Sequence, residues 1–238
     1  MTVAEEIFPF IYAVPLGYVN AFLLADPDGP TLVDSGLKGN YKRILQAIRE
    51  IGRKPEELRH VLVTHHHADH VGSLAALIEK SGAQAWVHPL DAPIVAGEKR
   101  RPHPNPASIA GRILGPVLER LPMNNPRPAK ATQLVNDGDV VPVGGGVQVI
   151  ATPGHTAGHV SYFVPGHGGV LFAGDAAGHM FGRIGKPALI FTEDMAQAKE
   201  SMRKLAALQF ETACFGHGTV LKGRANIEFR QYVEHMAK

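Results

Sequence analysis

The chain has 238 residues and carries 24 Lys and Arg against 22 Asp and Glu, which gives a formal net charge of +2 at pH 7. This charge is too small to indicate nucleic acid or an anionic membrane surface as the partner. With 45% hydrophobic and 19% charged residues the chain can bury a substantial core, and its length fits one large domain or two small ones. The single cysteine, Cys214, excludes an intrachain disulfide framework and a cysteine-based zinc site.

The N-terminus predicts neither export nor membrane insertion. Glu5 and Glu6 stand where a secretory signal would carry basic residues before a long apolar run. The longest apolar runs are much shorter than a membrane-spanning helix requires. We therefore expect a cytoplasmic protein, with no membrane association, that acts on a small molecule. Nucleic acid is disfavoured as a partner, and the sequence leaves open whether the protein forms an oligomer.

The N-terminal part of the chain predicts strands first and then strands alternating with helices. Short apolar segments, separated by Gly, Pro and Asp, predict strands at 10–14, 19–25, 31–36, 60–64 and 83–88. Helical spacing predicts helices at 39–52 and 72–82, the second ending at Gly82. The apolar face of the first helix consists of Ile44, Leu45, Ile48 and Ile51.

The segment 91–132 differs from the rest of the chain. It is rich in proline, contains the basic run EKRRPHP and has an amphipathic piece around 108–121. We expect a helical insertion or lid within one domain that spans 1–238. After it, the pattern predicts strands at 147–152, 159–164, 169–175 and 212–218, and helices at 193–208 and 225–238.

The two halves of the sequence echo each other weakly. In the first half, TLVDSG ends a strand with an aspartate and VLVTHH ends one with histidines; in the second half, VLFAGD and TACFGH repeat that order. Two β-rich halves with outer helices would bring these four strand ends to one edge.

The segment HVLVTHHHADHVG, residues 60–72, holds five histidines and one aspartate between an expected strand and an expected helix. His65 and His67 can converge on one point from an extended segment. Asp69 and His70 are adjacent and more easily face a second point nearby. Imidazole and carboxylate ligands without thiolate suit zinc, and also iron or manganese. The alternative is a fortuitous histidine-rich loop.

Three later residues weaken that alternative. His155 lies in a glycine-rich turn, Asp175 at a strand end in LFAGDAAG, and His217 at another strand end in CFGHG. Each is a metal-ligand type placed where glycine permits close approach of the backbone.

These elements, with Asp34 of TLVDSG, resemble the metallo-β-lactamase superfamily, in the same order and over almost the whole chain. The resemblance implies an α/β fold, an αββα sandwich of two mixed β-sheets with outer helices, and a dinuclear metal site at one edge. By position it implies a first metal held by His65, His67 and His155. It implies a second metal held by Asp69, His70 and His217, with Asp175 bridging the two. Asp34 would lie beneath the site and orient ligands. His66 occupies a variable position, and we do not expect it to be a ligand.

Two metals that share a carboxylate imply a hydrolytic mechanism. Bound there, the two metals would lower the pKa of a bound water towards about 7, which would supply hydroxide at neutral pH. Hydroxide then attacks a carbonyl carbon or phosphorus. Asp69 would both ligate and steer this nucleophile, and Asp175 would bridge, so these two are the expected catalytic carboxylates.

The turn TPGHTAGHVSY further resembles the thioester-hydrolysing glyoxalase II branch. That branch carries an added C-terminal helical region, whereas this chain ends about twenty residues after His217. Quorum-quenching lactonases of this fold usually have a tyrosine where this chain has Gly178. We therefore expect a stand-alone dinuclear hydrolase with two divalent metals, zinc before iron or manganese, acting on small esters, thioesters or lactones.

Three alternatives remain: a mononuclear iron persulfide dioxygenase, a phosphoesterase or nuclease of the same fold, and a non-catalytic metal-binding protein. For the substrate pocket the sequence offers Tyr18, His179, Arg183 and Lys186. Arg183 and Lys186 would suit an anionic substrate. A solvated loop explains His179, Arg183 and Lys186 equally well, and an ordinary turn aromatic explains Tyr18 better than a pocket role does. We expect His159 to support its turn and Cys214 to be a buried core thiol.

Overall fold

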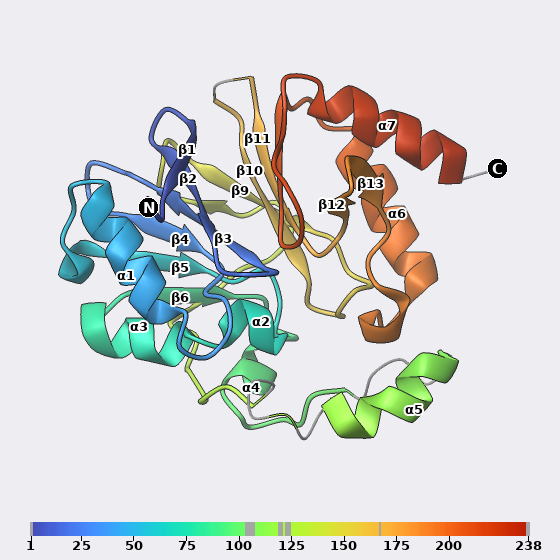
Figure 1. Cartoon of the computed structure of the whole chain (residues 1–238), viewed down its shortest axis with the longest axis horizontal. Helices are drawn as coiled ribbons and strands as arrows, with labels where there is room; N and C mark the ends of the chain where they lie inside the picture. Colours follow the sequence, from blue (N-terminus) through green and yellow to red (C-terminus); the bar gives the residue numbers. More distant parts are fainter. Residues whose placement is uncertain (1, 103–107, 119–120, 122–124, 167, 237–238) are drawn as a thin grey trace. The chain divides into compact units, whose positions relative to one another are not determined.

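The computed structural model describes residues 2–102, 108–118, 121, 125–166 and 168–236. The chain divides into two compact units (Figure 1), the first formed by Met1–Arg100 and Leu118–Val135, the second by Arg101–Val117 and Asn136–Lys238. Each unit has its own β-sheet and its own cluster of buried apolar side chains.

The first unit contains a seven-stranded mixed sheet in chain order. The strands from β1 to β4 pair antiparallel, and those from β4 to β7 pair parallel. The strands are β1 (Glu5–Phe8), β2 (Ile11–Pro15), β3 (Asn20–Leu24), β4 (Thr31–Val33), β5 (His60–Leu62), β6 (Gln84–Val87) and β7 (Gln133–Leu134).

Two helices of the first unit, α1 (Tyr41–Glu50) and α3 (Leu74–Ser81), lie side by side (Figure 1). The buried face of α1 contains Ile44, Leu45 and Ile48, as its spacing predicted. Gly82 ends α3 in the left-handed conformation with φ of 73°, which glycine adopts without steric strain. The short helical pieces are η1 (Pro55–Glu57), α2 (Ala68–Val71) and α4 (Ala92–Val95).

The second unit contains a six-stranded mixed sheet in the order β15-β14-β11-β10-β9-β8 and a separate hairpin of β12 and β13. The strands are β8 (Val140–Val141), β9 (Val147–Ala151), β10 (Val160–Val164), β11 (Val170–Gly174), β12 (Gly178–Met180), β13 (Arg183–Gly185), β14 (Thr212–Phe215) and β15 (Leu221–Lys222). The helices are α5 (Ile109–Leu118), η3 (Leu189–Phe191), α6 (Met195–Ala206) and α7 (Ala225–Met236). The side chain of Asp194 accepts a hydrogen bond from the Gln197 amide and so caps the first turn of α6.

Each unit places two candidate site residues at the ends of neighbouring parallel strands. In the first unit, β4 and β5 pair parallel, and Asp34 and His65 follow their carboxyl ends. In the second unit, β11 and β14 pair parallel, and Asp175 and His217 follow theirs. Since parallel neighbours end at the same edge of a sheet, each half of the expected site has a structural basis in its own sheet.

The two mixed sheets with helices confirm the predicted α/β class, whereas several short elements were not predicted. The strands outside the predicted ranges are β1, β7, β8, the hairpin of β12 and β13, and β15. The segment 91–132 contains α4 and α5, and its residues 103–107, 119–120 and 122–124 lie outside the described part of the chain. Its role as an insertion or lid stays a prediction. Among the described residues, no helix combines the length and the hydropathy that crossing a bilayer requires.

Candidate metal centre

The histidine run of the first unit follows β5 and leads into α2. His67, with extended backbone, is the N-cap residue of α2, and Asp69 and His70 lie within the helix. The rings of His65 and His70 are 4.1 Å apart between centroids, and those of His65 and His67 are 4.6 Å apart. A ligand atom of His65 lies within 4.8 Å of one on His67 and of one on His70, and Asp69 and His70 are equally close. The first unit therefore gathers the four predicted ligands of this run.

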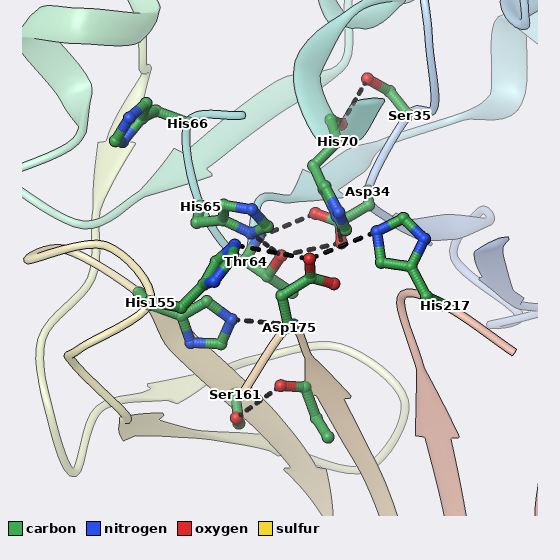
Figure 2. Close-up of polar contacts among 12 residues, drawn as sticks. Asp34, Ser35, Thr64, His65, His66, His70, His155, Ser161, Asp175 and His217 are labelled. Carbon is green, nitrogen blue, oxygen red and sulfur yellow. Dashed lines mark hydrogen bonds and ion pairs between the residues drawn. The ribbon is translucent and has the colours of Figure 1, made fainter. Parts of the chain in front are cut away.

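Asp34 lies at the base of this cluster (Figure 2). One carboxylate oxygen accepts the Thr64 backbone N–H at 2.8 Å; the other, Oδ2, accepts the Thr64 hydroxyl at 2.8 Å and lies 2.8 Å from Nδ1 of His70. The amide and hydroxyl of Ser35 both donate to the carbonyl of His70, at 2.7 and 2.8 Å. Asp34 thus contacts the ring of His70, and Ser35 holds its backbone.

The hydrogen-bond directions determine which ring nitrogens can bind a metal. Because the Asp34 carboxylate only accepts, Nδ1 of His70 carries the hydrogen, and Nε2 of the neutral ring keeps its lone pair. The Thr64 hydroxyl donates to Asp34, so it accepts from Nδ1 of His65 at 3.0 Å. His65 is thereby also left with Nε2 as its ligand nitrogen.

His66 turns away from this cluster (Figure 2). Its ring Nδ1 lies 3.0 Å from Oδ2 of Asp91, and its backbone N–H donates to the same oxygen at 2.9 Å. Both side chains are buried. The structure thus accounts for His66 by a contact with Asp91, in line with the prediction that it is not a ligand.

Asp175 is the centre of the candidate ligands of the second unit (Figure 2). Its Oδ2 lies 3.4 Å from Nε2 of His155 and 3.3 Å from Nε2 of His217. His155 is buried, whereas the side chain of His217 is 26% exposed. Two imidazole nitrogens thus face one carboxylate oxygen.

The tautomer of His155 is set in the same way as those of the first unit. The Thr192 hydroxyl donates to the Ala188 carbonyl at 2.9 Å, so it accepts from Nδ1 of His155 at 3.2 Å. Nε2 of the neutral ring then keeps its lone pair on the side of Asp175.

The predicted pocket residues have different environments. Tyr18 is 56% exposed, in the connection between β2 and β3, and Arg183 and Lys186 are exposed in the second unit. His179 is instead buried, with Nδ1 3.0 Å from the Thr219 carbonyl and 2.9 Å from its hydroxyl. These bonds join β12 to the loop that carries His217, since the His179 amide also donates to the His217 carbonyl at 3.2 Å.

Several residues that support the site were not predicted from the sequence. Thr64 and Ser35 adjoin predicted site residues, so their position next to His65 and Asp34 was a usable signal. Thr192 lies 37 positions from His155, and Asp91 lies 25 positions from His66. No local pattern could reveal these two partners.

The donor atoms of the candidate ligands suit divalent metals. They are imidazole nitrogens and carboxylate oxygens, the ligands that zinc shares with iron and manganese. Cys214 lies on β14 and is buried, as predicted. Burial raises the pKa of its thiol well above the usual range, which makes it an unfavourable ligand.

Comparisons with known proteins agree with this chemistry. The chain is 29% identical over 230 residues to the probable metallo-hydrolase YflN of Bacillus subtilis (strain 168), covering 90% of this chain and 86% of the relative. It is 34% identical over 171 residues to a hydroxyacylglutathione hydrolase of Rhodobacter capsulatus, covering 71% of this chain but only 52% of that protein.

Solved structures share the fold. MEM-A1, a subclass B3 metallo-beta-lactamase from a soil metagenome library, matches with a TM-score of 0.72 and 24% identity, over 98% of this chain and 92% of that one. BJP-1, a subclass B3 metallo-beta-lactamase of Bradyrhizobium japonicum, matches with a TM-score of 0.71 and 19% identity, over 99% and 92%. These likenesses confirm the predicted fold. The family model of the metallo-beta-lactamase superfamily matches residues 14–217, and the chain belongs to that superfamily.

Proposed function

We propose that the ligands of the two units combine into one dinuclear metal centre. His65, His67 and His155 would hold the first metal, and Asp69, His70 and His217 the second, with Asp175 bridging. One observation carries the proposal: the Nδ1 positions of His65, His70 and His155 are all engaged by oxygen atoms. These bonds leave Nε2 of each ring for a metal, and such outer bonds are typical of metal-ligating histidines.

The reaction that this centre supports best is hydrolysis of small esters, thioesters or lactones. When bound, two divalent metals polarise a carbonyl group and lower the pKa of water towards about 7. Asp175 would hold the spacing between the two ligand sets, and Asp69 would orient the attacking water. The thioester class is favoured by the hydroxyacylglutathione hydrolases among the relatives.

Each unit has exposed side chains that suit contact with a substrate. Tyr18 offers an aromatic surface and Arg183 and Lys186 offer positive charge, which suits a substrate with an anionic group. His179 is better suited to hold the His217 loop than to contact substrate, because Thr219 occupies its Nδ1.

The decisive experiment measures metal content and turnover together. Tag-free protein should contain close to two equivalents of metal, with zinc expected, and should hydrolyse members of an ester, thioester and lactone panel. His217→Ala should lose about one equivalent and most of the hydrolytic rate, and excess zinc or manganese should partly restore both. His235→Ala, which removes an exposed histidine of α7, serves as the control and should change neither.

Two results would contradict the proposal. Full activity with a stable single equivalent of metal would exclude a dinuclear mechanism. Persulfide-dependent oxygen uptake by iron-loaded protein, undiminished in His217→Ala and without ester turnover, would favour the mononuclear persulfide dioxygenase instead.

A further inference from the structure

A chain of buried hydrogen bonds begins at the backbone of Asp175. The Asp175 N–H donates to Nε2 of His159 at 3.0 Å, and Nδ1 of His159 lies 2.8 Å from the Thr152 hydroxyl. The Thr152 hydroxyl lies 3.0 Å from that of Ser161, which donates to the Ala173 carbonyl at 3.1 Å. Figure 2 shows Ser161 and this last bond below Asp175.

Every bond in the chain has a single consistent direction. A backbone N–H only donates, so Nε2 of His159 must be the accepting nitrogen, and Nδ1 of the neutral ring must carry the hydrogen. Nδ1 then donates to the Thr152 hydroxyl, which donates in turn to Ser161. The Ser161 hydroxyl accepts from Thr152 and donates its own hydrogen to the carbonyl of Ala173, which can only accept.

The chain of hydrogen bonds links three neighbouring strands and ends on β11, the strand that leads into Asp175. Thr152 follows β9, Ser161 lies on β10, and Ala173 lies on β11, two residues before Asp175. The side chains of Thr152, His159 and Ser161 are all at most 1% exposed. Leaving a buried hydroxyl or imidazole without its hydrogen-bond partner costs free energy. The ends of β9, β10 and β11 therefore resist moving apart.

The same hydrogen bonds also connect two candidate ligands, Asp175 and His155. The segment between Thr152 and His159 contains His155, and a backbone bond from the Thr152 N–H to the His159 carbonyl, 3.0 Å long, closes this turn. The His155 and His159 rings lie perpendicular, with centroids 6.1 Å apart. One end of the bond chain therefore fixes the backbone of Asp175, and its middle fixes the turn that carries His155.

We infer that His159, Thr152 and Ser161 form a positioning relay that sets the distance between Asp175 and His155. His159 is then not a metal ligand, because its Nε2 lone pair is occupied by the Asp175 N–H. The relay acts through the geometry of the two ligands, and this inference rests on the proposed function only for their role in binding metal.

The first test compares Thr152→Val with Thr152→Ser. Valine has nearly the same shape but no hydroxyl, whereas serine keeps the hydroxyl and loses only the methyl group. Thr152→Val should weaken metal binding about 10-fold or more, in the range seen for outer partners of metal ligands, and should alter the visible d–d spectrum of the Co²⁺-loaded protein. Thr152→Ser should resemble wild type in both. Circular dichroism confirms that each variant is folded.

Ser161→Ala and His159→Gln extend this test at both ends. Ser161→Ala removes the last donor and should shift the Co²⁺ spectrum in the same direction as Thr152→Val. His159→Gln can still accept from the Asp175 N–H and should retain more metal affinity than His159→Leu. Equal metal affinity and unchanged Co²⁺ spectra across Thr152→Val, Ser161→Ala and His159→Leu would overturn the relay.

A second test is independent of metal and of turnover. In ¹⁵N-histidine-labelled wild-type protein, assigned with His159→Gln, the His159 ring should show the neutral tautomer with hydrogen on Nδ1. The Asp175 amide should be protected from hydrogen exchange, and Thr152→Val should reduce that protection. Hydrogen on Nε2 in wild type would disprove the relay whether or not the protein hydrolyses esters. Confirmed tautomers in a protein without two metals or turnover would instead overturn only the proposed function.

Discussion

Nδ1 of His70 lies 2.8 Å from Oδ2 of Asp34, and both side chains are buried. Asp34 adopts a φ of 60°, in the left-handed region that few residues other than glycine, asparagine and aspartate enter. A strained backbone position therefore carries the carboxylate that sets the tautomer of a predicted ligand. Strain of this kind persists only where surrounding contacts determine the conformation.

Asp34→Asn should weaken binding of the second metal about 10- to 100-fold. Asparagine tolerates the left-handed backbone, but its amide nitrogen cannot accept from His70 or from Thr64. The affinity can be measured by competition with a chelating dye. Asp28→Asn, an exposed substitution in the same unit, is the control and should leave affinity unchanged. Equal affinities in the two variants would show that Asp34 does not orient the ligand.

Gly154→Ala should destabilise the fold by at least about 2 kcal/mol. Gly154 has a φ of 128°, and an added Cβ would lie 2.2 Å from the backbone nitrogen of Ala198 in α6. Backbone of a helix cannot move aside as a flexible side chain could. Urea unfolding measures the effect, with Gly166→Ala as the control, because nothing lies within 4 Å of a Cβ at that position. A free energy of unfolding equal to that of the control would contradict this packing.

Cys214 should not react with a thiol reagent in the native protein at pH 8. Its side chain is fully buried, and burial raises the pKa of the thiol, so the reactive thiolate is scarce at this pH. Absorbance of the released chromophore should show no labelling until guanidinium unfolds the chain, and then one equivalent. Rapid stoichiometric labelling of folded protein would mean that β14 is accessible.

Removing the metals should lower the thermal stability of the protein. A ligand that binds only the folded state stabilises it by about 2.7 kcal/mol when its free concentration is 100 times its dissociation constant. Calorimetry before and after dialysis against a chelator measures the shift, and restored zinc should reverse it. Identical melting temperatures would show that the histidine and aspartate clusters do not hold metal.

Substitutions on the exposed face of α5 should change substrate preference and leave metal content unchanged. Ile109, Ile113 and Val117 are 74%, 67% and 60% exposed at helical spacing, and grouped apolar side chains of this kind often mark a binding surface. Ile113→Ser should alter the ranking of ester, thioester and lactone substrates. Loss of metal together with equal loss of all activities would assign the helix to the core of its unit.

The sequence by itself determined most of the regular elements and the candidate ligand set. Apolar periodicity predicted α1, α3, α6 and α7, because one face of each must be buried whatever lies opposite. The central strands could be predicted for the same reason. Short elements with few side chains to bury, such as β15 and the hairpin of β12 and β13, left no such pattern. His65 stood out because it belongs to a histidine run behind a strand, and Asp175 because it follows a strand end among glycines.

Only the tertiary structure decided which nitrogen of each histidine is available and which residues hold the ligands in place. The ligand candidate His155 depends on Thr192, 37 positions away, and His66, which is not a ligand, is held by Asp91, 25 positions away. His159 depends on hydroxyls from neighbouring strands, Thr152 and Ser161. A hydrogen bond depends on the distance and direction between two atoms. Packing brings such atoms together from distant positions in the chain, and no local sequence pattern marks them as partners.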